Sequence, residues 1–211
     1  MSDSDFAALL CSGLCHDLVS PVGAINNGLE ILEDETDASM REAVIDLITK
    51  STQQAAHKLQ FFRLAFGAAG GFSAQLDVRE AEKALSELLA GSRIVLDWFV
   101  SVNSISKSLV KLLLNVSLLV SETLIRGGVL TIKLDAVEDG YALEIKASGD
   151  RIILQDAIKD ALLGNLAPED MEPRTAPAYL ASILVQEMGG KLVLTNSENE
   201  LTVKALVKAR N

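Results

Sequence analysis

Apolar residues in the first third of the chain return at steps of three, four and seven, the spacing of one face of an α-helix. This pattern predicts two long helices, at 3–34 and 39–66, joined by an acidic turn, EDETDAS, at 33–39. Ser4 is the expected N-cap of the first helix, because a serine hydroxyl accepts a hydrogen bond from a free backbone N–H there. The apolar stripes consist of Leu14, Leu18, Val22, Ile25, Leu29 and Leu32 on the first helix and Val44, Ile48, Ala55, Leu59, Phe62 and Phe66 on the second.

A hairpin of two helices buries little apolar surface by itself, so stripes of this length need further partners. A second copy of the hairpin would supply them in a four-helix bundle, because a two-fold axis pairs the same surface of both copies. Each large apolar side chain that becomes fully buried contributes roughly 1.5 to 3 kcal/mol. The stripes therefore predict a homodimer.

The run GAAGGF at 67–72 is the clearest linker and separates a first part, 1–68, from a second part, 73–211. In the second part, helical and strand patterns alternate. The predicted order is a helix at 77–90, a strand at 93–100, a helix at 104–128 closed by a glycine pair, a hairpin at 129–148, a helix at about 153–163, a loop at about 164–177, a helix reaching Gly189 and Gly190, and two strands around SENE. This order predicts an α+β fold whose mixed sheet carries helices on one face.

Composition narrows the class of partner. The 211 residues are 49% hydrophobic, enough for a sizeable core, and carry a net charge of −10. Binding to nucleic acid or to an anionic membrane needs clustered Lys and Arg, so we expect no nucleic acid and no membrane partner. The N-terminus lacks the basic start of a signal peptide, and the most apolar run, LVKLLLNVSLLV, is too short to span a bilayer. We expect a cytoplasmic protein.

Cys11 and Cys15 lie one helical turn apart, next to His16. These three side chains could begin a metal site, but a zinc site needs a fourth ligand and the chain has no further cysteine. The other interpretation is that both cysteines are small packing residues in a reducing compartment. We expect no bound metal.

His16 stands on the polar side of the first helix. On a helical wheel of roughly 100° per residue, it lies roughly 165° from the centre of the apolar stripe. Small and polar residues share its side, which would let the backbone of another protein approach closely. They are Ser12, Gly13, Ser20, Gly23 and Asn27.

An exposed imidazole on a rigid helix can act as a nucleophile, because it is substantially neutral near pH 7. Asp17 could accept a hydrogen bond from one ring nitrogen and leave the other free to attack phosphorus. Pro21 lacks a backbone N–H, so it should bend the helix or free the carbonyl of Asp17. A lone surface histidine is also an ordinary feature, and His57, with no adjacent acid and no following proline, is expected to be merely solvated.

The run HDLVSP, followed by VGAI, closely resembles the H-box of two-component sensor histidine kinases. In that family the histidine lies on the first helix of a dimeric four-helix bundle and exchanges a phosphoryl group with a receiver-domain aspartate. The resemblance implies that His16 is the phosphoacceptor and that Asp17 orients or polarises it. It also implies that Pro21 is the kink of the helix and that Ser20 occupies a position that assists phosphatase chemistry in some kinases.

The second part resembles the ATP-binding domain of these kinases in its order of elements, but the residues that bind ATP are missing. Asn115 stands in the asparagine box, yet the later asparagine of that box is Leu119. In KASGDRI, Ala147 replaces the aspartate that reads adenine and Arg151 replaces a glycine. The run TAPAYL has no glycine where the family has a phosphate-cradling loop, and side chains there block close approach.

An intact H-box joined to a degenerate ATPase-like domain resembles the ChpT histidine phosphotransferases of alphaproteobacteria. The resemblance implies a dimeric bundle and phosphotransfer site in 1–68 and an α/β sandwich of the histidine-kinase ATPase type in 73–211. It implies a relay in which His16 takes phosphoryl from the receiver of a hybrid histidine kinase and passes it to cell-cycle response regulators of the CtrA type. No ATP would bind, and Mg²⁺ would sit in the partner receiver.

Two other functions stay open on the sequence. The protein could be an autophosphorylating kinase with unusual ATP motifs, which would require Leu119, Ala147 and Arg151 all to be tolerated. It could also be a dimer that binds receivers without chemistry, in which case the complete HDLVSP pattern would be unnecessary. Labelling of His16 by ATP distinguishes an autophosphorylating kinase from a relay protein. A variant without His16 distinguishes a receiver-binding dimer from a relay protein.

Overall fold

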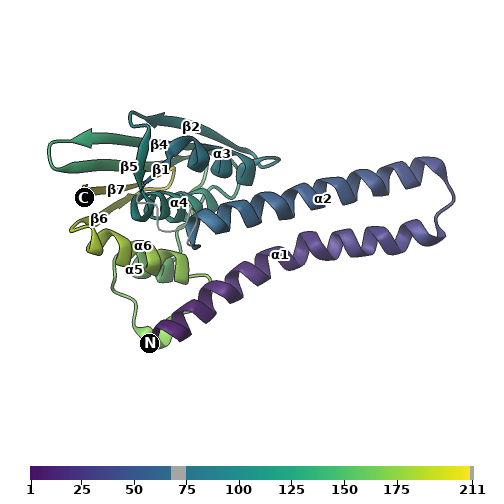
Figure 1. The fold of residues 1–211 in the computed structure, drawn as a ribbon, viewed down its shortest axis with the longest axis horizontal. Coiled ribbons are helices and arrows are strands. Elements are labelled where there is room, and N and C mark those ends of the chain that lie inside the picture. The colour runs from purple at the N-terminus through teal and green to yellow at the C-terminus, as the bar shows by residue number, and fades with distance from the viewer. Residues whose placement is uncertain (68–74, 210–211) are drawn as a thin grey trace.

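The N-terminal part is an antiparallel helical hairpin, as predicted. The computed structural model describes residues 1–67 and 75–209, so most of the predicted linker at 67–72 lies outside the described residues. Helix α1 spans Asp3–Asp34 and α2 spans Ala38–Ala65. The tip of the hairpin extends away from the rest of the molecule (Figure 1).

The first helix begins at Asp3, as predicted, but the residue that caps it is not the predicted one. Its N-cap is Ser2, not Ser4: the Ser2 hydroxyl accepts a hydrogen bond from the Asp5 N–H at 3.2 Å, and the Asp5 carboxylate accepts one from the Ser2 N–H at 3.0 Å. This reciprocal capping box needs an acid three residues after the cap. Ser2 has that acid and Ser4 does not, which explains the shift.

The two helices of the hairpin pack tightly through small residues. A Cβ on Gly28 would lie 2.6 Å from Ile48 Cγ1, so only glycine allows this approach. Val44 lies against the same glycine and Pro21 is also buried, but the predicted stripe is only partly covered. Val22 and Leu29 remain 53% and 52% exposed. One chain alone therefore leaves apolar surface along its hairpin.

The C-terminal part is a five-stranded mixed sheet. Strands β2 (Ile94–Val100), β4 (Gly128–Val137), β5 (Gly140–Ser148), β7 (Glu200–Lys208) and β6 (Lys191–Asn196) follow one another in that order. Only β2 and β4 run parallel. Alternate residues of β4 are buried, so one face of the sheet packs on helices while the other is open. The predicted α+β fold, with helices on one face, is confirmed.

The helices within residues 75–209 are α3 (Val78–Leu89), α4 (Lys107–Glu122), α5 (Asp156–Leu162) and α6 (Ala176–Glu187), with a 3₁₀ turn, η1, at Pro168–Asp170. The predicted helix at 104–128 was wrong at both ends. Residues 104–106 form strand β3 (Ser104–Ser106), paired with β1 (Gln75–Asp77). The hydroxyls of Ser121 and Thr123 bond the carbonyls of Leu118 and Val120, which competes with helix continuation.

The hairpin and the sheet part share one core. The C-terminal end of α2 places Phe61 and Phe62 among the buried residues of α4 and the sheet. Asn115 of α4 donates its side-chain amide to the carbonyl of Ala65 at 3.0 Å. On the other helix of the hairpin, α1, the ring of Phe6 packs edge-on against Tyr179 of α6, with ring centroids 5.4 Å apart. These contacts hold the N-terminal end of α1 beside α6 and the C-terminal end of α2 beside α4, as Figure 1 shows.

Candidate functional site

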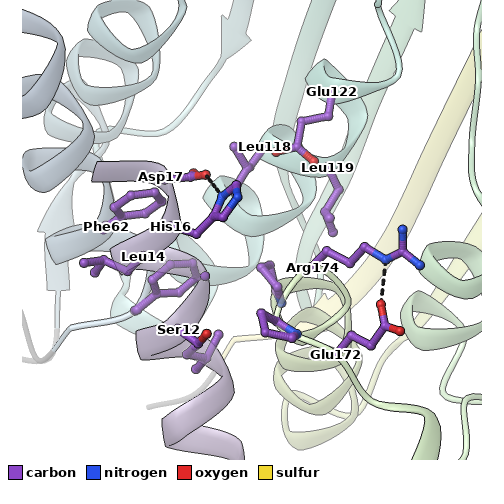
Figure 2. Close-up of a pocket in the computed structure, with 15 residues that line it drawn as sticks. Ser12, Leu14, His16, Asp17, Phe62, Leu118, Leu119, Glu122, Glu172 and Arg174 are labelled. Carbon is purple, nitrogen blue, oxygen red and sulfur yellow. Dashed lines mark ion pairs between the residues drawn. The ribbon is translucent and has the colours of Figure 1, made fainter. Parts of the chain in front are cut away.

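His16 lies at the junction of the two parts. Its side chain is 90% exposed, which confirms the solvent-facing position predicted from the wheel. It lines a pocket of about 390 Å³ formed by α1, the end of α2, α4 and the segment between α5 and α6. Figure 2 shows His16 and Asp17 facing the pocket from α1, Glu122 from the end of α4, and Glu172 and Arg174 from the segment before α6. The imidazole is thus accessible and fixed on a helix.

Asp17 is beside His16, but the two side chains are too far apart for the hydrogen bond that the sequence suggested. Its Oδ1 lies 3.7 Å from Nδ1 of His16, an ion-pair distance if the ring is protonated. This geometry places the carboxylate on the Nδ1 side of the ring. The other nitrogen, Nε2, is the one left free to react.

Pro21 leaves the carbonyl of Asp17 without its usual backbone donor, and a lysine of α2 donates a hydrogen bond to it. In a regular helix the N–H of residue 21 would donate to that carbonyl, but proline has none. The ammonium of Lys58 donates to the Asp17 carbonyl oxygen at 3.0 Å. Lys58 was not predicted from the sequence, because no motif pairs a lysine of the second helix with the H-box. The one available signal was the orphan carbonyl itself.

Glu122, the last residue of α4, is a second group that sequence reasoning missed. The residue as a whole is exposed, but crowding of its carboxyl by the surrounding protein, followed by the nearby Asp17 carboxylate, raises the pKa of Glu122 to about 7, while Lys58 lowers it. A carboxyl with this pKa changes charge near neutral pH. It does so in the same pocket as His16.

The raised pKa of Glu122 predicts a pH-dependent stability. The favourable contribution of the protonated carboxyl is fully present below 4.5, its ordinary pKa, and is lost as the pH rises through about 7. We expect Glu122→Gln to raise the free energy of unfolding at pH 8, because the neutral amide avoids the cost of ionising this carboxyl in the folded protein. The gain should be only about 1 kcal/mol, since solvent screens an exposed group. The gain should disappear below pH 4.5. Denaturant titrations at several pH values measure it.

Glu144 provides a control of opposite sign for that experiment. Hydrogen bonds from Lys204 and Lys133 lower the pKa of Glu144. Its stabilising contribution is therefore present above its ordinary pKa and is lost as the pH falls through the lowered value. Glu144→Gln should destabilise the protein at pH 8. If the free energy of unfolding depends on pH in the same way in wild type and in Glu122→Gln, the raised pKa of Glu122 described above is wrong.

The predicted docking residues divide into two groups. Ser12, Ser20 and Asn27 are exposed, and a Cβ on Gly23 would meet nothing within 4 Å, so this side of α1 is open. Gly13 instead faces its own chain, because a Cβ there would lie 3.3 Å from the carbonyl oxygen of Pro173. These positions surround His16 on one face of α1, and their part in docking stays a prediction.

The rim of the pocket that faces α6 carries an ion pair. Arg174 Nε lies 2.8 Å from Glu172 Oε2, and both side chains are more than half exposed. Their residues flank Pro173, which contacts Gly13. His57, the second histidine, is half-buried on α2 rather than fully solvated, and it does not line this pocket.

The residues at the ATP positions do not fit a nucleotide or its magnesium ion. Asn115 is fully buried and its amide is used by the carbonyls of Ala65 and Lys111. Ala147 is buried in the sheet and has no carboxylate, while Leu119 lines the pocket of His16.

The start of α6, where sensor histidine kinases have their phosphate-cradling loop, has no glycine in the run TAPAYL. The Thr175 hydroxyl donates to the carbonyl of Glu172 and accepts from its N–H, so this side chain is committed to the local turn. Within residues 1–67 and 75–209, no group of three His, Cys, Asp or Glu side chains could hold a metal ion. Cys11 and Cys15 are both free and exposed.

Comparisons with known proteins agree on one family. Residues 78–200 match the family model described as the histidine phosphotransferase C-terminal domain. The protein phosphotransferase ChpT of Brucella abortus (strain 2308) is 32% identical over 205 residues, which is 97% of each chain. The solved structure of a bacterial phosphotransferase superposes with a TM-score of 0.87 at 32% identity, over 98% of each chain. The Acinetobacter baumannii histidine kinase AdeS, at 11% identity over 93% of this chain and 98% of its own, superposes with a TM-score of 0.47.

Proposed function

Because this chain belongs to the histidine phosphotransferase family and is a protein phosphotransferase of a phosphorelay, we propose that His16 is the residue that carries the phosphoryl group. One observation carries the proposal: the His16 side chain is 90% exposed and stands at the mouth of a pocket with an aspartate at its Nδ1. His57 offers neither feature, since it is half-buried and away from the pocket.

The proposed reaction is an exchange between His16 and an aspartyl phosphate. Nε2 of the neutral ring attacks phosphorus, the N–P bond forms, and the bond from phosphorus to the receiver carboxylate oxygen breaks, so the carboxylate leaves with the electron pair. The ring then carries positive charge with its proton on Nδ1. Asp17, 3.7 Å from Nδ1, stabilises that charge. The reverse sequence passes the group to the next aspartate.

The proposed partners are receiver domains. A hybrid histidine kinase would supply the phosphoryl group and response regulators of the CtrA type would accept it. The open face of α1 at Ser12, Ser20, Gly23 and Asn27 supports docking beside His16, because small side chains there allow close approach. Mg²⁺ would be held by the acidic pocket of the receiver. Ser20, exposed one turn beyond His16, is the residue to examine for assisted hydrolysis.

We propose that transfer does not use ATP. The misfit of Asn115, Ala147 and Leu119 to a nucleotide supports this. We expect no label on His16 after incubation with Mg²⁺ and labelled ATP, and rapid label after addition of a phosphorylated receiver. Acid-labile phosphate followed by mass spectrometry measures both. Label from ATP alone that vanishes in His16→Ala would make the protein an autokinase, and binding of receivers with no label at all would favour a non-catalytic binding protein.

We also propose a cytoplasmic homodimer joined through a four-helix bundle. Large apolar side chains stay exposed along both helices of the hairpin, among them Val22 and Leu29 on α1 and Ile45 and Leu59 on α2. Among the described residues, α1 is also the one helix long and apolar enough to cross a membrane by length and composition. A second hairpin accounts for that apolar surface equally well, and it leaves His16 and Asp17 in water, where receivers can reach them.

A further inference from the structure

We propose that Lys58 is a positioning residue for phosphoryl transfer: its ammonium group replaces the backbone donor that Pro21 removes and so holds the turn of α1 that carries His16 and Asp17. The inference rests on the proposed role of His16. It adds a residue from the second helix to a site that the H-box alone would confine to the first.

The hydrogen-bond pattern of α1 is the first support. The carbonyl of residue 17 would normally accept from the N–H of residue 21, which is proline here. A carbonyl without a donor inside a protein junction is unfavourable, and helices usually bend open at such a position. Lys58 supplies a charged donor at 3.0 Å, in a partly buried contact that joins residues 41 positions apart. The bond ties α1 to α2 one residue after His16.

The charges around the site are the second support. The pocket is lined by the carboxylates of Asp17, Glu122 and Glu172, and by Arg174, which is paired with Glu172. An incoming phosphoryl group is itself negative, so these acids oppose its approach. Lys58 acts on Asp17 through its carbonyl and lies close enough to Glu122 to lower the pKa of that carboxyl. It therefore places positive charge near two of these acids, Asp17 and Glu122.

The test compares variants of one helix. Lys58→Met removes the charge and the donor and keeps the length, Lys58→Arg keeps both, and Lys50→Met is the matched control. Lys50 is also on α2 but pairs with Asp46 at 2.6 Å on the open surface, with its side chain 72% exposed. We expect Lys58→Met to lower the single-turnover rate of transfer from a phosphorylated receiver at least 10-fold at saturating receiver, with a small change in KM. Lys58→Arg should restore most of the rate, and Lys50→Met should match wild type.

A double-mutant cycle tests the path through Asp17. In Pro21→Ala the N–H of residue 21 can again donate to the Asp17 carbonyl. Lys58→Met should therefore lower the single-turnover rate of transfer much less in that background than in wild type. An equal loss in both backgrounds would overturn the inference, as would a wild-type rate in Lys58→Met or a loss in Lys58→Met that only follows a lower melting temperature. If Lys58→Met does not fold, Lys58→Arg and Lys58→Gln, assayed in both backgrounds, decide the question.

Failure of the proposed function looks different. If wild-type protein takes no label on His16 from any phosphorylated receiver, the role of His16 is wrong and Lys58 has nothing to position. If wild type is labelled on His16 and Lys58→Met is labelled as fast, only the role of Lys58 is wrong.

Discussion

Substitution of His16 by alanine is expected to abolish phosphoryl transfer in both directions while leaving the fold intact. The imidazole is 90% exposed and packs against little, so its loss removes a nucleophile without opening a cavity. Asp17 remains in the variant, but its carboxylate does not replace the imidazole, so the phosphohistidine step cannot occur. We expect the rate of transfer between two receivers to fall roughly 10⁴-fold or more, to the level without protein. Labelled phosphate followed between two purified receivers measures it.

His57→Ala is the matched control for that experiment. It removes the only other histidine, half-buried on α2 and outside the pocket, so it should keep transfer close to wild type. Binding separates chemistry from docking: His16→Ala should bind receivers with nearly unchanged affinity, because small neighbours rather than the ring make the approach possible. Transfer that persists in His16→Ala and is lost in His57→Ala would reverse the assignment.

The sequence was most informative where function depends on local geometry. The exposure of His16, the neighbouring acid and the carbonyl freed by Pro21 all follow from the positions of residues within one helix, since 3.6 residues per turn fix which side chains share a face. The two long helices and the sheet with one covered face follow from periods of apolar residues in the same way.

Long-range contacts were beyond such reasoning. Lys58 reaches Asp17 across 41 positions, and Glu122 arrives at the same pocket only because α2 and α4 share a core. Asn115 shows a further limit: the sequence placed it in the asparagine box, but only the tertiary structure shows that its amide donates to the carbonyl of Ala65. The end of α4 was missed because hydroxyl groups that compete for helix carbonyls are weak signals in an apolar run.

The second large effect concerns the quaternary structure. We expect Val22→Glu combined with Leu29→Glu to convert a homodimer into a monomer. Both side chains are about half exposed in a single chain, at 53% and 52%, so the change should leave the hairpin and the core folded. The two residues are seven positions apart on α1, and Leu59 of α2 is exposed to a similar degree, as expected for a seam between hairpins. Sedimentation velocity over a range of concentrations measures the change.

The size of this effect follows from symmetry. A two-fold interface loses the substituted side chains twice, so four large apolar groups leave it, which weakens the dimer by roughly 6 kcal/mol or about 10⁴-fold. The same pair of changes on the open face of the sheet, Val193→Glu with Leu206→Glu, is the matched control, since these side chains are 59% and 67% exposed. A monomer produced by the sheet pair and a dimer retained by the hairpin pair would place the interface on the sheet and overturn the four-helix bundle.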